Sequence, residues 1–249
     1  KRAINILLFK HHREYKDKQT PKNYIIGKLP KQLQSDLNKL KKIAIQGMME
    51  NKLIFEFDDD DDDVAKLSDS GLFHKLDDKR RNNFCFLHLT IQEFLAALHV
   101  VDDMNNVEAF LSKHIDNPQW HLVIQFVSGL VGDKMRELET EREKLKRSTE
   151  PQNIEKRQQL SESETTIHSI CKRFSNWMKK APSICKEKDL LVIKCVHEMQ
   201  VTHVMKELAA SFKCEGNAEV FYLRDVNIAP AESTALFQFL SFIKNLHVL

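Results

Sequence analysis

The sequence predicts a mainly α-helical protein, and two observations lead to that fold class. Only 6 glycines and 6 prolines occur among 249 residues, so tight turns and hairpins are scarce and long helices are favoured. Apolar residues make up 42% of the chain, and in most segments they recur at the three- and four-residue intervals that gather side chains on one helix face. A sandwich or a barrel is therefore not expected.

The charge balance and the chain ends further restrict the class of protein that we expect. Lys and Arg number 38 against 36 Asp and Glu, which is not the basic excess of an obligate nucleic-acid-binding protein. No apolar run reaches the roughly 18 uncharged residues of a membrane span. The chain starts without Met or a signal sequence and ends inside an apolar pattern, so we expect a cytoplasmic segment of a longer protein. The widely spaced cysteines are expected to be reduced thiols: Cys85, Cys171, Cys185, Cys195 and Cys214.

The first half of the chain predicts a helix followed by two strands. Apolar residues at helical spacing run from Leu33 to Met48, with Gly47 near the end of the helix. Two β-prone runs follow, at residues 53–57 and 83–89. A helix and then two strands flanking a loop indicate a winged-helix unit.

Six consecutive aspartates, Asp58 to Asp63, lie between the two expected strands. Calcium and magnesium bind carboxylate oxygens, but a binding loop needs spaced ligands and a turn glycine, and this run has neither. A solvated, self-repelling wing tip is favoured over a metal site. The lysines Lys39, Lys41 and Lys42 are likewise interpreted as a solvated helix face rather than a nucleic-acid patch.

Capping boxes and apolar spacing predict the remaining elements. Thr90 as the cap and Glu93 three residues later open a helix that runs to Val101. A charged stretch at 133–164 has too few apolar residues for a coiled coil, so a solvated helix or a partly disordered insertion is expected, with a second capping box at Ser161. The other expected elements are helices near 107–111, 120–131, 188–199 and 201–212, a strand at 220–223 and a helix opened by Pro230.

The run from Phe84 to Leu98, Phe-Cys-Phe-Leu-His-Leu-Thr-Ile-Gln-Glu-Phe-Leu-Ala-Ala-Leu, resembles the signature that closes the winged helix of NACHT-type nucleotide-binding, leucine-rich-repeat receptors, the NOD-like receptor family. Leu72-Phe73 before it and the run from Cys195 to Gln200 after it agree in order with that family. The resemblance implies four parts in order: the end of helical domain 1 (1–27), a winged helix (28–103), helical domain 2 (104–213) and the first leucine-rich repeat of a solenoid (214–249).

The same resemblance assigns His88 a contact with nucleotide. In that family the histidine of this motif reaches from the winged helix to the phosphate of ADP and holds the inactive state, and an imidazole N–H can donate to a phosphate oxygen. The alternative is a histidine satisfied inside its own domain. The family's phosphate-binding loop and its acidic magnesium motif have no match here, so ADP or ATP would be bound mostly by an upstream module and no catalysis is expected of this segment.

Other residues predict no further site. His197, Glu198 and His203 miss the zinc-protease spacing, because the second histidine would have to stand at Val201. The remaining histidines have no partner cysteines at metal-ligand spacing, and no serine or cysteine carries a nucleophile signature, so we expect neither a metal nor a catalytic residue. The aromatic residues Trp120, Phe126, Phe174 and Trp177 are expected to pack the helical block.

The expected function is the regulatory middle of a cytosolic innate immune receptor. Its partners in cis would be the upstream NACHT module and the downstream repeats, and sensing through the repeats would release ADP-controlled autoinhibition and permit homo-oligomerisation of an inflammasome-like kind. The alternative is a helical interaction scaffold, or a winged-helix nucleic-acid-binding module, without nucleotide switching. An upstream phosphate-binding loop distinguishes the two.

Overall fold

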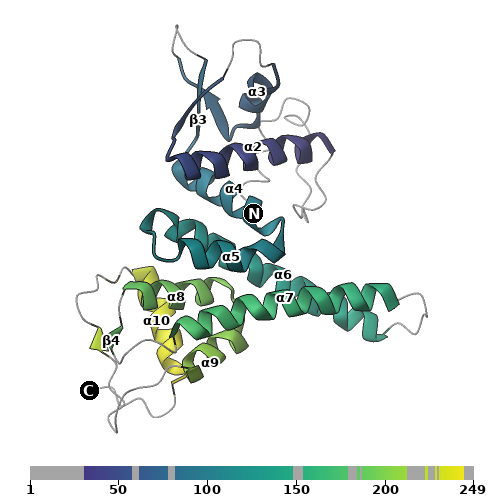
Figure 1. Ribbon diagram of the computed structural model, residues 1–249, viewed down its shortest axis with the longest axis vertical. Helices are drawn as coiled ribbons and strands as arrows, with labels where there is room; N and C mark the ends of the chain where they lie inside the picture. Colours follow the sequence, from purple (N-terminus) through teal and green to yellow (C-terminus); the bar gives the residue numbers. More distant parts are fainter. Residues whose placement is uncertain are drawn as a thin grey trace. The chain divides into compact units, whose positions relative to one another are not determined.

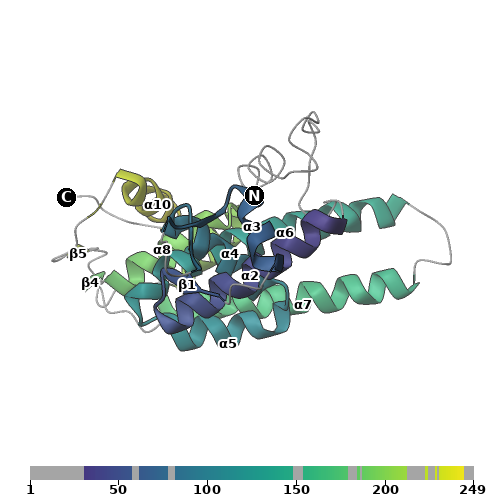
Figure 2. The same ribbon diagram turned by 90° about the horizontal axis from the view of Figure 1, so that it is seen from above.

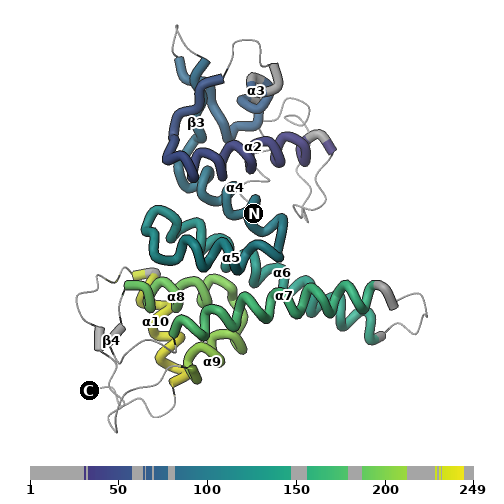
Figure 3. Tube along the Cα trace, in the orientation of Figure 1, coloured from purple at the N-terminus to yellow at the C-terminus, as the bar shows by residue number. Residues whose placement is uncertain are grey.

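The computed structural model describes residues 31–57, 62–77, 82–147, 154–178, 184–185, 187–211, 222–223, 228 and 230–243. The chain is mainly helical, as predicted, and it divides into two compact units, residues 1–99 and 100–249 (Figure 1). Figure 3 traces the same elements as a Cα tube. No helix in these ranges combines the length and the apolar character that crossing a membrane requires. The expected end of helical domain 1, residues 1–27, lies outside the described residues.

Unit 1 consists of a small antiparallel sheet and the helices that accompany it. Its elements are α2 (Lys31–Glu50), β1 (Ile54–Glu56), α3 (Asp62–Leu67), η2 (Ser68–Ser70), β2 (Phe73–Lys75), β3 (Asn83–Phe86) and α4 (Leu89–Val101), whose last two residues belong to unit 2. The strand order is β1-β3-β2, and Phe84 of β3 pairs with Phe55 of β1. The predicted helix and the first predicted strand are confirmed. The second strand is confirmed from Asn83 to Phe86 but ends three residues earlier than predicted, because Leu89 already begins α4. The strand β2 was not predicted, because its residues, Phe73 to Lys75, include only one strongly β-prone side chain, whereas β1 lies within a β-prone run at 53–57.

The core of unit 1 is a cluster of phenylalanines on one face of the sheet. Phe55, Phe73, Phe84 and Phe86 are each exposed by 8% or less, and the rings of Phe73 and Phe84 stack with centroids 5.5 Å apart. Burying one such side chain stabilises a fold by about 1.5–3 kcal/mol. The buried face of α2 contributes the aliphatic residues Leu33, Leu37, Leu40, Ala44 and Met48.

A close approach at Gly47 joins α2 to β1 and α4. A Cβ atom at this position would overlap the ring of Phe55 and lie 2.6 Å from Nε2 of Gln92. Gln92 is buried, and its amide donates to the carbonyl of Lys52 at 3.0 Å, just before β1. The glycine therefore lets one buried amide connect the start of β1 to the first turn of α4.

The expected wing tip of aspartates is wrong for the part of the run that is described. Asp62 and Asp63 begin α3, which comes before the hairpin that joins β2 to β3. Carboxylates are stabilised in the first turn of a helix by its dipole, which is compatible with a helical end to this run. Asp58 to Asp61 lie outside the described residues.

Unit 2 is a block of packed helices. Its elements are α5 (Met104–His114), η3 (Pro118–Trp120), α6 (His121–Arg147), α7 (Ile154–Met178), β4 (Ile184–Cys185), α8 (Glu187–Glu198), α9 (Thr202–Ser211), β5 (Tyr222–Leu223) and α10 (Pro230–Ser241). The helix α6 packs against α7 and α8, and α10 packs against α8 and α9, so the expected repeat after residue 213 shares a core with the preceding helices. Trp120 and Phe174 are buried, as predicted, and Cys171 and Cys195 are buried free thiols.

The helices α6 and α7 form a long hairpin that extends beyond the other helices of unit 2 (Figure 2). The charged stretch is thus largely helical, in agreement with the solvated-helix alternative, while residues 148–153 lie outside the described part. The capping box at Ser161 is wrong, because α7 already begins at Ile154. The intervening residues Glu155 to Leu160 are good helix formers, and they extend the helix upstream of the expected cap.

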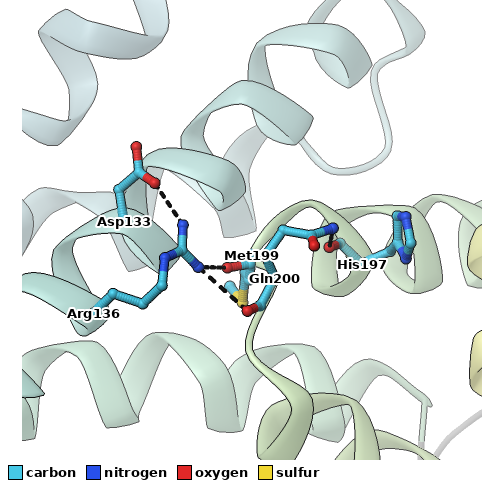
Figure 4. A network of polar contacts seen from close by, with 5 residues as sticks. All are labelled: Asp133, Arg136, His197, Met199 and Gln200. Carbon is cyan, nitrogen blue, oxygen red and sulfur yellow. Dashed lines mark hydrogen bonds and ion pairs between the residues drawn. The ribbon is translucent and has the colours of Figure 1, made fainter.

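A second close approach, at Gly132, places α6 against the turn between α8 and α9. A Cβ atom at Gly132 would overlap the carbonyl oxygen of Met199 and lie 2.6 Å from its Cα. One helical turn later, Arg136 donates to the carbonyls of Met199 and of Gln200, the latter at 3.3 Å, and is held by Asp133 at 2.5 Å (Figure 4). Gln200 has a left-handed backbone with φ of 55°. Arg136 therefore satisfies carbonyls that the end of α8 leaves without helical partners.

The strands β4 and β5 pair in parallel, with Ile184 opposite Tyr222. Each strand is followed in the chain by a helix, α8 or α10, and these two helices pack against each other. Unit 2 therefore contains two successive strand-helix segments that stack side by side, although α9 is inserted between them.

We expect Gly132→Ala to lower the free energy of unfolding of unit 2 by about 3 kcal/mol, because overpacking against backbone cannot be relieved by a rotamer change. Gly129→Ala is the matched control: its Cβ would meet the carbonyl oxygen of Glu198 at 3.5 Å and the Cβ of Glu198 at 3.9 Å, both ordinary contacts. Gly129→Ala should change stability by about 1 kcal/mol or less, in the stabilising direction. Urea unfolding followed by tryptophan fluorescence measures unit 2, which contains both tryptophans, Trp120 and Trp177. Equal effects of the two variants would contradict the close approach.

His114 should make unit 2 sensitive to acid. Its ring lies 4.3 Å from that of Trp120 and 4.8 Å from that of Phe110, and burial, followed by the charge of Lys113, lowers the pKa of His114 below 6.5. As the pH falls below about 6.5, the unfolded chain binds a proton that the folded chain does not yet bind, so stability is lost until the pH reaches the folded pKa.

The variant His114→Phe keeps an aromatic ring at this position and removes the group that binds the proton. Wild type and variant should differ little in urea midpoint at pH 7.5, whereas at pH 5.5 the variant should retain more of its stability, as measured by tryptophan fluorescence. Parallel pH profiles would show that His114 does not contribute.

Candidate functional site around His88

His88 stands between the end of β3 and the start of α4, and its side chain is exposed. Its carbonyl accepts from the amide of Ile91 at 2.9 Å, the first hydrogen bond of α4, and its Nδ1 accepts from the amide of Thr90 at 3.1 Å. His88 is therefore the N-cap of α4, with an imidazole in the position usually taken by Ser, Thr, Asp or Asn. The alternative of a histidine enclosed in its own core does not fit this exposed side chain.

The cap determines which ring nitrogen carries the proton. Because Nδ1 accepts a hydrogen bond, it has no hydrogen, and in the neutral ring the proton sits on Nε2. The Nε2–H group is a donor on an exposed ring at the N-terminus of a 13-residue helix, where the helix dipole favours an anion. The arrangement can bind an anionic oxygen.

The predicted cap at Thr90 is wrong by two residues. The helix α4 begins at Leu89, so Thr90 lies inside its first turn and donates its amide to His88. Histidine is an uncommon cap, and a pattern search that looks for Ser or Thr therefore selects the neighbouring threonine. Glu93, the other member of the expected capping box, is buried, and this burial raises its pKa above 4.5 while the charge of nearby His88 opposes the shift.

Five large apolar side chains of unit 1 are exposed, from the end of α2, the start of β1 and the residues next to the cap, and we call them the apolar rim: Met49, Leu53, Ile54, Leu87 and Leu89, with exposed fractions of 45–65%. Two of them flank His88 in the chain. The pairing of Ile54 with Cys85 brings the start of β1 beside the end of β3, and the bond from Gln92 to the carbonyl of Lys52 brings it beside α4. Exposed apolar side chains from neighbouring segments are typical of a site that contacts another protein.

The other residues weighed for sites do not assemble into one. Nδ1 of His197 pairs with Oε1 of Gln238 at 2.6 Å, and His203 is exposed near the start of α9. Within the described ranges, no group of three His, Cys, Asp or Glu side chains is arranged to hold a metal ion. The interpretation of the lysines on α2 as one solvated face is wrong for Lys41, which is only 5% exposed.

No protein-family model matches the chain, and no curated protein matches its sequence.

We expect His88→Ala to weaken the start of α4 by about 1 kcal/mol, because the amide of Thr90 loses its acceptor, whereas His88→Ser should restore the cap. Hydrogen–deuterium exchange of a peptide covering the first turn of α4 reports this amide directly. Exchange should accelerate in His88→Ala and stay near the wild-type rate in His88→Ser. If Ala and Ser behaved alike, the imidazole would not act as the cap.

Proposed function

We propose that this chain is the regulatory middle segment of a cytoplasmic NOD-like immune receptor, in which repeat-based sensing is coupled to ADP-controlled autoinhibition and oligomerisation. The observation that carries the proposal is the state of His88. Its ring is exposed, it is oriented by its bond to the amide of Thr90, and it offers an Nε2–H donor. The family resemblance requires such a histidine to reach a diphosphate held by another module, and a ring enclosed in unit 1 could not do so.

The apolar rim supports the same proposal. Five large apolar side chains exposed in unit 1, two of them next to His88 in the chain, fit a surface that is covered in one state of a switch and released in another. In the closed state the rim would pack against the upstream nucleotide-binding module while His88 donates to the phosphate of ADP. ATP and the sensed ligand would favour the open state, provided that each binds the two states with different affinity.

Unit 2 supports the second half of the proposal. The parallel pair of β4 and β5, with α8 stacked on α10, has the arrangement of strand-helix units in a solenoid, in which each unit buries its apolar face against the next. We propose that β5 and α10 form the first leucine-rich repeat. Helical domain 2 would then transmit the position of the repeats through the shared core of α8 and α10.

The proposal assigns this segment a binding and regulatory role, with no catalytic residue. Hydrolysis of ATP, where it occurs, would belong to the upstream module, which carries the phosphate-binding loop in this family. The rival hypothesis is an interaction scaffold in which the apolar rim binds a partner and His88 is only a helix cap. The two hypotheses differ in what happens when the imidazole is removed but the cap is retained.

The test uses the receptor expressed together with the nucleotide-binding module that the resemblance places upstream. His88→Ser keeps α4 capped and removes the Nε2–H donor, so bound ADP, measured by chromatography after denaturation, should fall because affinity drops about tenfold or more. The oligomeric fraction in size-exclusion chromatography should rise in parallel. His99→Gln, which alters a half-buried histidine near the other end of α4, is the control and should retain ADP. Undiminished ADP in His88→Ser would favour the scaffold.

A further inference from the structure

A pocket of about 490 Å³ opens within unit 2, where α9 lies against the α6–α7 hairpin. Its floor is apolar: Leu138, Ile167, Cys171 and Val204 line it and are each exposed by 5% or less. The sulfur atoms of Cys171 and Met135 lie 3.8 Å apart and join the α7 and α6 sides of this floor. The volume falls within the roughly 300–1,000 Å³ range typical of sites for small molecules.

The rim of this pocket is acidic. Each of the three helices contributes one carboxylate: Glu139 from α6, Glu164 from α7 and Glu207 from α9. Arg142 is the basic residue among the lining side chains, and its Nη1 lies 3.8 Å from Oε1 of Glu164, a long and exposed pair of little strength. With neutral histidines, the lining carries two more negative than positive charges.

The carboxylates of Glu139 and Glu207 are not used by the fold. Neither forms an ion pair with any residue that the structure describes. The charge of Glu207 also acts on the floor: burial first, and then this carboxylate, raise the pKa of Cys171 to about 12. The pocket therefore presents unpaired negative charge beside an apolar floor.

The dimensions of the pocket and the chemistry of its lining indicate which class of ligand it can bind. The α6 side of the lining spans Met135 to Arg142, or about 10 Å at 1.5 Å per residue, which is too short to seat a partner helix of several turns. Negative charge disfavours phosphates and nucleotides. Several carboxylates around one apolar floor suit a linear ligand in which ammonium groups alternate with methylene segments, since the methylenes can cover the floor while the charges remain at the rim.

We propose that this pocket binds an aliphatic polyamine. The ligand would bring the carboxylates of α6, α7 and α9 together around its ammonium groups, displace Arg142 from Glu164, and so stabilise the base of the α6–α7 hairpin against α9. The inference concerns unit 2 alone and does not rest on the proposed contact of His88 with nucleotide.

Isothermal titration calorimetry of the full chain with spermidine, in 0.15 M salt, tests the proposal. We expect saturable binding with one site, weakened roughly tenfold by the pair of substitutions Glu139→Gln and Glu207→Gln. Arg142→Gln should act in the opposite direction and tighten binding about threefold, because it removes the competing cation. Far-UV circular dichroism verifies that the variants, all at exposed helix positions, remain folded.

The control is Glu143→Gln, which removes one carboxylate from α6 outside the pocket, where it pairs with Nζ of Lys146 at 2.7 Å. It is compared with Glu139→Gln alone, which makes the same charge change inside the pocket and should weaken binding about threefold. An equal loss in this control would show diffuse attraction to the hairpin, and no saturable binding by wild type would likewise overturn the proposal. A lysine-containing tripeptide is titrated in parallel. Saturation by the peptide but not by spermidine would overturn the free polyamine as ligand and assign the pocket to a lysine of a protein.

Discussion

Unit 2 depends on the absence of a side chain at one position of α6. At Gly132 the backbone of α6 comes so close to Met199 that only hydrogen can stand between them, and the contact brings Arg136 within reach of the carbonyls of Met199 and Gln200, just after the end of α8. Met199 is buried, so its carbonyl needs a partner of this kind within the protein. The same approach sets where α8 ends and α9 begins, and thereby where α9 lies along the α6–α7 hairpin.

Much of this architecture could be predicted from local signals. The apolar period of α2 and the proline that opens α10 both act within a few residues, and both predictions are confirmed. The strand β2 was not predicted, because its residues have little β-propensity of their own and it is defined by its pairing with β3. The close contacts at Gly47 and Gly132 were also not predicted, for a related reason. A glycine inside a helix looks merely unfavourable until its neighbour, distant in the sequence, is known.

The site shows the same division between local and distant information. The resemblance selected His88, and the exposure of its ring is compatible with that choice. The sequence pattern, however, assigned the helix cap to Thr90, so it did not predict that His88 caps α4. The apolar rim was also not predicted, since its members come from α2, the start of β1 and both sides of His88, and their exposure depends on how those segments fold. The pocket in unit 2 was the hardest feature to predict from the sequence. Its lining comes from three helices, and two of them include parts of the stretch that was interpreted as a charged insertion.

An imidazole used as a helix cap has a consequence that a serine or an aspartate would not have. The imidazole is a rigid planar ring, so the bond from the Thr90 amide to Nδ1 also fixes the direction of the N–H on the opposite side of the ring. A serine or an aspartate caps a helix with an oxygen and has no second donor of this kind. A ligand that rotates this ring would therefore also disturb the first hydrogen bonds of α4.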